Sequence, residues 1–470
     1  MSEAISKQLD CIFKPRTMAV IGASADPRKW GQWMVDRTMK SGYRGTIYPV
    51  NPKEKEILGL KVYPAVTDIA DEIDLAVIAV PAQAVPTVMR ECAQQGVRTA
   101  IIVSGGFAEV SQAGRSYQDE VTQIAREAGI RFLGPNCMAI WSSAASLCLS
   151  FPRAPRPGLV AFVSQSGGLG GLFAQVASSK GYGLSKFISI GNQADLNVAD
   201  FMEYLADDPD TRAIVLYMEG FPEGRRFFEA AKDVVKQKPV LIYKAGRTAA
   251  GSRATISHTA SLTGTDQVID ALCRQVGLIR AYEIFHPFDM AEALASQPLP
   301  RGNRIAVVSV GGGQGVILAD FCAYLGMELP EFDDATSADL QTALGAHVPA
   351  PKNPVDLGGA AETPQRFGDI LEKVASIDYI DGIIASQPSA GFVDLGTAEM
   401  ARAAVDAGEA IAAIPQKYGK PLILGATRWA SKGLVIDIIK NAGIPVYETP
   451  EDCARAMLGL VRYGEIRRRN

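Results

Sequence analysis

Residues 19–24 read Ala19-Val20-Ile21-Gly22-Ala23-Ser24, a short apolar run that passes into a glycine turn. The same succession of apolar run, glycine-bearing turn and amphipathic helix recurs along the whole chain. It is typical of parallel sheets with helical crossovers, so we expect an α/β fold of doubly wound domains with mainly parallel sheets. The expected strands are 17–22, 46–50, 75–80, 99–103 and 131–133, then 159–163, 186–190, 213–217 and 240–243, and finally 304–310, 382–385, 421–425 and 445–447.

The length of 470 residues is too great for one core and suggests about three domains of ordinary size. Two stretches rich in proline, 151–158 and 297–302, interrupt the alternating pattern. They read as linkers because proline and glycine end regular elements and stiffen connections. We therefore expect doubly wound domains at 1–150, 158–297 and 303–470.

The composition narrows the class of protein. Hydrophobic residues make up 47% of the chain, charged residues 21%, and the formal net charge is −4, a balance that does not favour nucleic acid or a membrane surface as partner. The N-terminus lacks the apolar core of a signal peptide, and no window is apolar for long enough to span a bilayer. The seven cysteines are scattered without a CxxC pair, so we expect reduced core cysteines in a cytoplasmic protein and no metal site.

Turns after the strands of the first segment predict a nucleotide site, because ligands of such sheets bind at the carboxyl ends of strands. The second strand ends in Asn51-Pro52-Lys53 and not in the acid that would hold the ribose of NAD. A lysine there suits a ribose that carries phosphate, which leaves NADP or coenzyme A, and the glycine spacing favours coenzyme A. The candidate binding residues are Gly22, Ala23, Ser24, Lys53, Val80, Pro81, Ser104, Gly105 and Asn136.

Turns of the second segment carry a different chemistry. Ser164-Gln165-Ser166-Gly167-Gly168 precedes a predicted helix at 169–179, and free backbone N–H groups at a helix start cradle anions. Glu219 ends a buried apolar run, where a carboxylate needs a partner. The partner we expect is His258, in a stretch of small residues at 244–264 that reads as a mobile loop. The alternative is a surface loop with an incidental histidine.

An anion cradle, an imidazole and a carboxylate at one sheet edge together suggest phosphoryl transfer through a phosphohistidine. A carboxylate that accepts a hydrogen bond from the N–H of one ring nitrogen leaves the other nitrogen free to act as nucleophile.

Several short motifs of this chain also occur together, in the same order, in one known family. They are Val20-Ile21-Gly22-Ala23-Ser24, Asn51-Pro52-Lys53, Gly134-Pro135-Asn136, Ser164-Gln165-Ser166-Gly167-Gly168, Gly191-Asn192, Tyr217-Met218-Glu219-Gly220, Lys244-Ala245-Gly246-Arg247, Ser257-His258-Thr259, Gly311-Gly312-Gly313 and Asn353-Pro354-Val355-Asp356.

On these motifs the chain resembles the NDP-forming acyl-CoA synthetases, the α subunits of ADP-forming acetyl-CoA synthetases in particular, and more distantly the succinyl-CoA synthetase α subunits. The resemblance implies a Rossmann-like CoA-binding domain at 1–150, a flavodoxin-like domain with the phosphohistidine at 158–297, and a second flavodoxin-like domain at 303–470. It implies that His258 is phosphorylated and that Glu219 orients it. Phosphate would convert the acyl-CoA into an acyl phosphate, whose phosphoryl group would pass through His258 to ADP.

The same resemblance implies a partner. We find no ATP-grasp domain in the sequence, so ADP or ATP with Mg²⁺ is expected on a separate ATP-grasp β subunit, in an α2β2-type assembly. Ala260 and Met138-Ala139 depart from the family pattern, and the second departure puts the shape of the thioester pocket in doubt. Two other functions stay open: a CoA-binding regulatory module without catalysis, and an NADP-dependent oxidoreductase.

Overall fold

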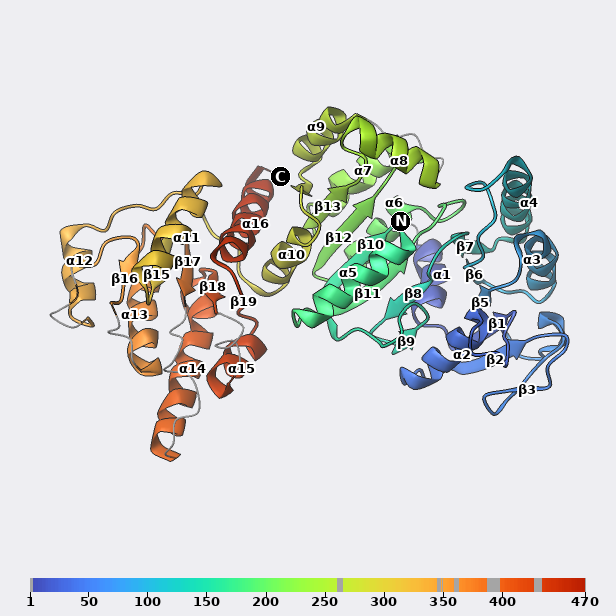
Figure 1. Ribbon diagram of the computed structural model, residues 1–470, viewed down its shortest axis with the longest axis horizontal. Coiled ribbons are helices and arrows are strands. Elements are labelled where there is room, and N and C mark those ends of the chain that lie inside the picture. Colours follow the sequence, from blue (N-terminus) through green and yellow to red (C-terminus); the bar gives the residue numbers. More distant parts are fainter. Residues whose placement is uncertain are drawn as a thin grey trace. The chain divides into compact units, whose positions relative to one another are not determined.

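Among the described residues, three large sheets built mainly of parallel strands are covered by helices (Figure 1), and β3 and β4 form a separate two-stranded antiparallel sheet. The computed structural model describes residues 3–259, 265–344, 348, 350–358, 363–386, 398–426 and 433–469. Contacts between residues divide the chain into two compact units, Met1–Phe285 and His286–Asn470. The α/β class with mainly parallel sheets, expected from the sequence, is confirmed.

The first sheet has the strand order β2-β1-β5-β6-β7, and all its pairs are parallel. Its inner strands are almost continuously apolar because helices cover both faces of such a sheet. The elements are α1 (Glu3–Phe13), β1 (Thr17–Ile21), α2 (Trp30–Lys40), β2 (Thr46–Val50), β3 (Glu56–Ile57), β4 (Leu60–Lys61), η1 (Val66–Asp68), β5 (Leu75–Ile78), η2 (Ala82–Ala84), α3 (Val85–Gln94), β6 (Thr99–Ile102), α4 (Gln112–Ala128) and β7 (Arg131–Leu133).

The second sheet belongs to the same unit and has the order β14-β13-β12-β10-β11-β8-β9. Five strands are parallel, and β8 and β9 extend the sheet in antiparallel fashion beside β11. The elements are β8 (Ile140–Ser142), β9 (Leu147–Cys148), β10 (Pro157–Ser164), α5 (Gly167–Ser179), β11 (Leu184–Ser189), α6 (Val198–Asp207), β12 (Ala213–Met218), α7 (Gly224–Val234), β13 (Val240–Lys244), α8 (Ala249–Thr259), α9 (Asp266–Val276) and β14 (Ile279–Ala281).

The second unit contains a parallel sheet with the order β16-β15-β17-β18-β19. Among the described residues of the chain, no helix combines the length and the apolar character needed to cross a membrane. The elements are α10 (His286–Ser296), β15 (Ile305–Ser309), α11 (Gly312–Tyr324), α12 (Asp334–Gln341), β16 (Val355–Asp356), α13 (Pro364–Ser376), β17 (Gly382–Ser386), α14 (Ala398–Tyr418), β18 (Leu422–Gly425), α15 (Leu434–Asn441), β19 (Val446–Tyr447) and α16 (Pro450–Arg469).

All thirteen strands expected from the sequence occur, with ends that differ by at most two residues. The short strands β3, β4, β8, β9, β14 and β16 were not expected. The prediction of a loop at 244–264 is wrong for part of this stretch, because Ala249–Thr259 forms the helix α8. The alanines in that stretch favour a helix more strongly than its glycine and serine oppose one.

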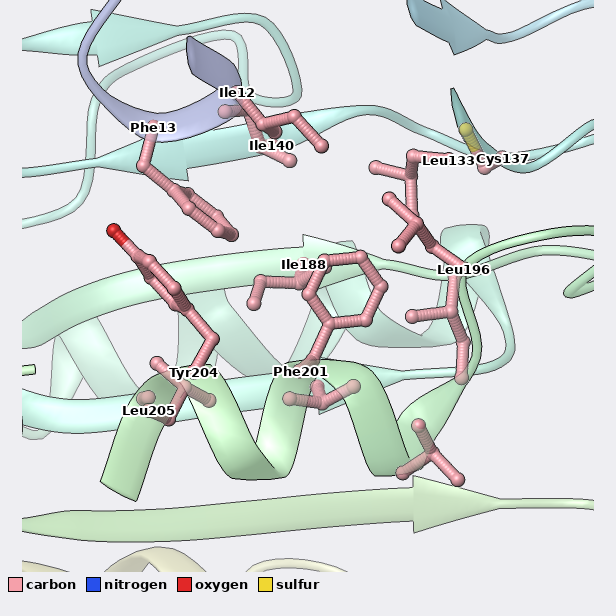
Figure 2. Packing of buried hydrophobic residues seen from close by; sticks show 14 of the residues in the cluster. Ile12, Phe13, Leu133, Cys137, Ile140, Ile188, Leu196, Phe201, Tyr204 and Leu205 are labelled. Atoms are coloured by element: carbon pink, nitrogen blue, oxygen red, sulfur yellow. The ribbon is translucent and has the colours of Figure 1, made fainter. Parts of the chain in front are cut away.

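The N-terminal helix α1 contacts both sheets of the first unit, and Figure 2 shows its residues Ile12 and Phe13 beside Ile140 and Tyr204. Phe13 stacks on Tyr204 of α6 with ring centroids 4.9 Å apart, and it meets Phe201 edge-on at 6.2 Å. The Tyr204 hydroxyl donates a 2.8 Å hydrogen bond to Asp10 of α1. One core cluster therefore includes residues of α1, of the first sheet and of the second sheet.

Candidate functional site

A cavity of about 550 Å³ opens between the carboxyl edge of the first sheet and the start of α5. The turns after β5, β6 and β7 form one wall, and the turns after β10 and β11 form the other. The cavity is lined by Trp30, Ala79, Val80, Pro81, Val103, Ser104, Gly105, Asn136, Cys137, Met138, Gln165, Ser166, Gly167, Gly168, Gly191 and Asn192.

Nine of the predicted binding residues meet in this cavity, five from the first segment and four from the second. They are Val80, Pro81, Ser104, Gly105 and Asn136, and Gln165, Ser166, Gly167 and Gly168. The predicted residues outside the lining are Gly22, Ala23, Ser24, Lys53, Ser164 and Glu219. The two sets of turns were predicted separately, and the structure brings them to one place.

The turn after β1 is packed tightly against its neighbours. Gly22 has a φ of +88°, and a Cβ atom there would lie 2.5 Å from the carbonyl oxygen of Ala79. Asn51 donates a 2.6 Å hydrogen bond from its side chain to the Ala23 carbonyl and accepts one of 2.8 Å from the backbone of Lys53. Asn51 thus joins the turns after β1 and β2, and the exposed Lys53 lies on the outer side of this edge.

The turns after β5, β6 and β7, which we call the rim of the cavity, are held together by polar contacts. The Ser104 hydroxyl donates a hydrogen bond to the Val80 carbonyl, which joins the turns after β6 and β5. Asn136 is in the left-handed region with a φ of +56°, which asparagine tolerates better than most residues. Trp30, at the start of α2, completes this wall and is 49% exposed.

Asn192 connects the two walls. Its amide nitrogen donates to Glu109 at 2.6 Å and to Gln118 at 3.0 Å, and its amide oxygen lies 3.4 Å from the amide nitrogen of Asn136. Glu109 also accepts from the backbone N–H groups of Gly106 and Phe107. Burial alone would raise the pKa of Glu109, but the hydrogen bonds from Asn192 and from backbone amides outweigh it and leave the pKa below its ordinary value.

The start of α5 presents backbone N–H groups to the cavity. Ser166 is its N-cap residue, but no side-chain capping hydrogen bond is made there. The first amides of a helix lack partners within the helix, and the positive end of the helix dipole adds to their attraction for anions. The Ser164 hydroxyl is buried and donates to the Ser166 carbonyl at 2.7 Å, so Ser164 shapes this turn from below.

The side chain of Gln165 connects the turn before α5, the predicted anion cradle, to the end of β12. Its side-chain oxygen accepts from the backbone N–H of Glu219 at 2.9 Å and from that of Gly220 at 3.0 Å. Glu219 is 4% exposed. Burial, followed by the nearby charge of Glu219, raises the pKa of Tyr217, and burial lowers the pKa of Lys244 at the end of β13. Glu219 is thus a buried carboxylate whose backbone is fixed.

His258 lies in α8 near its C-terminal end, and its side chain is outside the described residues. The described beginning of the helix is anchored, because the Ser252 hydroxyl donates to the Gly246 carbonyl at 2.9 Å. The pairing of His258 with Glu219 therefore stays a prediction. Ala260 also lies outside the described residues.

Trp30, Gly191, Asn192 and Glu109 were not predicted as site residues. Gly191 and Asn192 belong to one of the motifs of the resemblance, and Gly191 has no room for a side chain, because a Cβ atom would lie 2.2 Å from the Pro135 carbonyl oxygen. That motif was the sequence signal from which Gly191 and Asn192 could have been predicted as site residues. Within the described part of the chain, no three His, Cys, Asp or Glu side chains gather as metal ligands do.

Comparisons with known proteins agree with this layout. Residues 16–142 match the CoA binding domain family, and residues 157–294 match the succinyl-CoA ligase like flavodoxin domain family. The chain is 39% identical over 456 residues to the α subunit of acetate–CoA ligase [ADP-forming] II of Pyrococcus furiosus, covering 97% of both chains. It is 37% identical to the α subunit of the form I enzyme of the same organism, covering 97% of this chain and 98% of that one.

A longer relative and a solved structure extend the comparison. Acetate–CoA ligase [ADP-forming] II of Archaeoglobus fulgidus is 34% identical, and the match covers 97% of this chain but 67% of that protein. The structure of the dinucleotide forming acetyl-coenzyme A synthetase 1 of Candidatus Korarchaeum cryptofilum, in complex with phosphate and ADP, has a TM-score of 0.87 at 31% identity. That match covers 98% of this chain and 97% of the solved one.

Proposed function

The chain belongs to the family of ADP-forming acetate–CoA ligases, and we propose that it is the α subunit of an ADP-forming acyl-CoA synthetase. The reaction interconverts acyl-CoA, ADP and phosphate with a carboxylic acid, coenzyme A and ATP. The observation that carries the proposal is the shared cavity, in which Val80, Ser104 and Asn136 face the anion cradle at Ser166–Gly168. A thioester and a phosphate held in these two places would lie next to each other.

The first step needs a nucleophile and an acyl group in one enclosed space. A phosphate oxygen attacks the thioester carbonyl, the C–O bond of an acyl phosphate forms, the C–S bond breaks, and the thiol of coenzyme A leaves with a proton. Backbone N–H groups at the start of α5 hold the phosphate anion and need no side-chain movement to do so. Coenzyme A would lie along the turns after β5, β6 and β7.

The second step uses His258 and Glu219. A ring nitrogen of His258 attacks the phosphorus of the acyl phosphate, the P–N bond forms, and the carboxylate leaves. ADP then takes the phosphoryl group from the imidazole to give ATP. Glu219 supports this role because it is buried and its backbone is fixed by Gln165, so it can hold one ring tautomer and stabilise the positive charge that develops.

The nucleotide would be held by another polypeptide. The chain matches relatives named as α subunits over nearly their full length, but only 67% of the longer relative of Archaeoglobus fulgidus. We infer that the remaining third corresponds to a separate ATP-grasp β subunit that binds ADP or ATP with Mg²⁺, in an α2β2-type assembly. This chain would contribute the coenzyme A site, the phosphate cradle and His258.

The test is phosphorylation of the co-expressed complex by labelled ATP. We expect phosphate that is labile in acid and stable in base on the wild-type chain and on His286→Ala, the matched histidine control at the start of α10, and no label on His258→Ala. Coenzyme A binding should survive in His258→Ala. Label that persists in His258→Ala would contradict the assignment, and binding of NADP without binding of coenzyme A would favour an oxidoreductase.

A further inference from the structure

Met138 lies between the two halves of the cavity. It follows Asn136 of the rim, and it lines the cavity together with Gly167 of the cradle. Two buried serines hold its backbone: its N–H donates to the Ser189 hydroxyl at 2.9 Å, and its carbonyl accepts from the Ser150 hydroxyl. The backbone is thus fixed on both sides, and the side chain is half-buried at the cavity wall.

The thioether side chain crosses the first turn of α5. A Cβ atom built on Gly167 would lie 2.7 Å from the Cγ of Met138, and one built on Gly171 would lie 4.0 Å from its Cε. The methionine therefore occupies the space that a side chain at Gly167 would need. Because methionine is unbranched and flexible, its terminal methyl group can shift when a different group is placed against it.

The chemistry of the proposed reaction places the acyl group here. The acyl carbonyl must lie between the sulfur of coenzyme A, on the rim side, and the phosphate, on the cradle side. After Trp30 at the outer wall, Met138 has the largest apolar side chain of the described lining, and no lysine, arginine or histidine occurs in that described lining. An uncharged acyl chain that continues from the carbonyl would meet the thioether first.

We propose that Met138 sets the size of the acyl group that this chain accepts, as a specificity-determining residue that closes the acyl pocket behind the carbonyl carbon. The inference rests on the proposed function. With methionine in place, the pocket suits short acyl chains, and a smaller side chain opens it for longer or branched ones. A side chain with a bulky ring at this position leaves room for the smallest acid alone.

The experiment compares Met138→Ala and Met138→Phe with wild type in the complex with its partner subunit. The substrates are acetate, butyrate, 3-methylbutyrate and phenylacetate, and the readout is the ratio of kcat/KM for each acid to that for acetate. We expect Met138→Ala to raise the ratio for the larger acids by about tenfold or more, the usual effect of a change in pocket volume. Met138→Phe should lower it by a similar factor.

Two further variants keep the result interpretable. Met39→Ala changes an exposed methionine of α2 away from the cavity and should leave all ratios as in wild type. Met138→Leu conserves volume and should retain the wild-type order of acids if the other variants fold poorly. Equal ratios in Met138→Ala, Met138→Leu and wild type, with activity present, would overturn the inference.

A binding measurement separates this inference from the proposed function. Calorimetric titration of the isolated chain with acetyl-CoA and with phenylacetyl-CoA should show that Met138→Ala binds the larger thioester several-fold more tightly, with little change for acetyl-CoA. If wild type binds coenzyme A but forms no acyl-CoA from any acid with its partner, the proposed function fails. If it is active and neither the ratios nor these affinities change in Met138→Ala, the role of Met138 alone fails.

Discussion

Asn192, three residues after the end of β11, donates a 2.6 Å hydrogen bond to Glu109, which follows β6 in the first sheet. This contact joins residues 83 positions apart and spans the two walls of the cavity. This amide side chain therefore adds to the shared core and to the Arg131–Asp195 ion pair in holding the two walls of the cavity together.

Asn192→Ala should weaken both folding and coenzyme A binding. Removal of a hydrogen bond to a charged, partly buried group typically costs about 1–3 kcal/mol. We expect a lower melting temperature and several-fold weaker coenzyme A binding by calorimetry. Asn441→Ala, at an exposed position of α15, is the matched control and should change neither quantity. A wild-type affinity in Asn192→Ala would show that the contact does not hold the walls.

Glu109 should make stability depend on pH in the acidic range. Its pKa in the folded chain is lowered, so the folded state favours the ionised carboxylate. This contribution is present above the ordinary pKa of a glutamate and is lost as the pH falls through the depressed value. In thermal melts between about pH 6 and about pH 3, Glu109→Gln should lose less stability than wild type. Parallel pH profiles for the two proteins would contradict this.

Two variants of Gln165 separate its role in fixing the backbone at Glu219 from the effect of charge on anion binding. Gln165→Leu leaves the backbone N–H groups of Glu219 and Gly220 without their acceptor, at about 1–3 kcal/mol for each buried group. Gln165→Glu keeps an acceptor oxygen but adds a negative charge beside the cradle. We expect added phosphate to stabilise the wild type, Gln165→Leu to melt earlier, and Gln165→Glu to fold well but to lose the stabilisation by phosphate. Equal phosphate stabilisation of Gln165→Glu and wild type would argue against an anion site.

Lys53 should distinguish coenzyme A from its dephospho form. It is exposed in the turn after β2, and the sequence predicts that it binds a phosphate on the ribose. Because an exposed ion pair is worth up to about 1 kcal/mol, Lys53→Ala should weaken coenzyme A binding by up to about fivefold and leave dephospho-coenzyme A unchanged. Lys232→Ala, an exposed lysine of α7, is the control. An equal loss for both ligands would place the ribose phosphate elsewhere.

Lys186 and Asp208 form a fully buried ion pair with a distance of 2.5 Å between Nζ and Oδ2. Breaking this pair tests how well the core near α6 excludes water. Lys186→Met leaves a buried carboxylate unpaired and should cost about 3–5 kcal/mol in urea unfolding, and Lys186→Met with Asp208→Leu should recover much of it. The exposed pair Lys236 and Asp233 gives the comparison, since Lys236→Met should change stability by less than about 1 kcal/mol. A mild effect of Lys186→Met alone would mean that water reaches the pair.

The sequence predicted the sheets well because their strands are continuous apolar runs of the right length, such as 213–218. It predicted much less about α8, where the small residues indicate a loop although Ala249, Ala250 and Ala254 favour a helix. Strands of two or three residues, such as β8 and β9, carry no period of their own, and their pairing is decided by distant partners.

At the site, too, local sequence patterns predict some features, and contacts between distant residues decide the others. That the turns within each sheet lie together was predictable, because turns after parallel strands share one edge. The meeting of the two edges in one cavity, and the contact of Asn192 with Glu109, depend on how the two sheets pack. That packing is set by long-range contacts, which no local pattern reports.

The position of α1 has a consequence for biosynthesis. Asp10 and Tyr204 are separated by 194 residues, so the first helix leaves the ribosome well before its docking surface on α6 exists. At about 5–20 residues per second, the nascent chain must keep the apolar face of this helix unaggregated for roughly 10–40 seconds. A pause in translation between α1 and α6 would prolong that interval, and chaperone demand in the cell should rise accordingly.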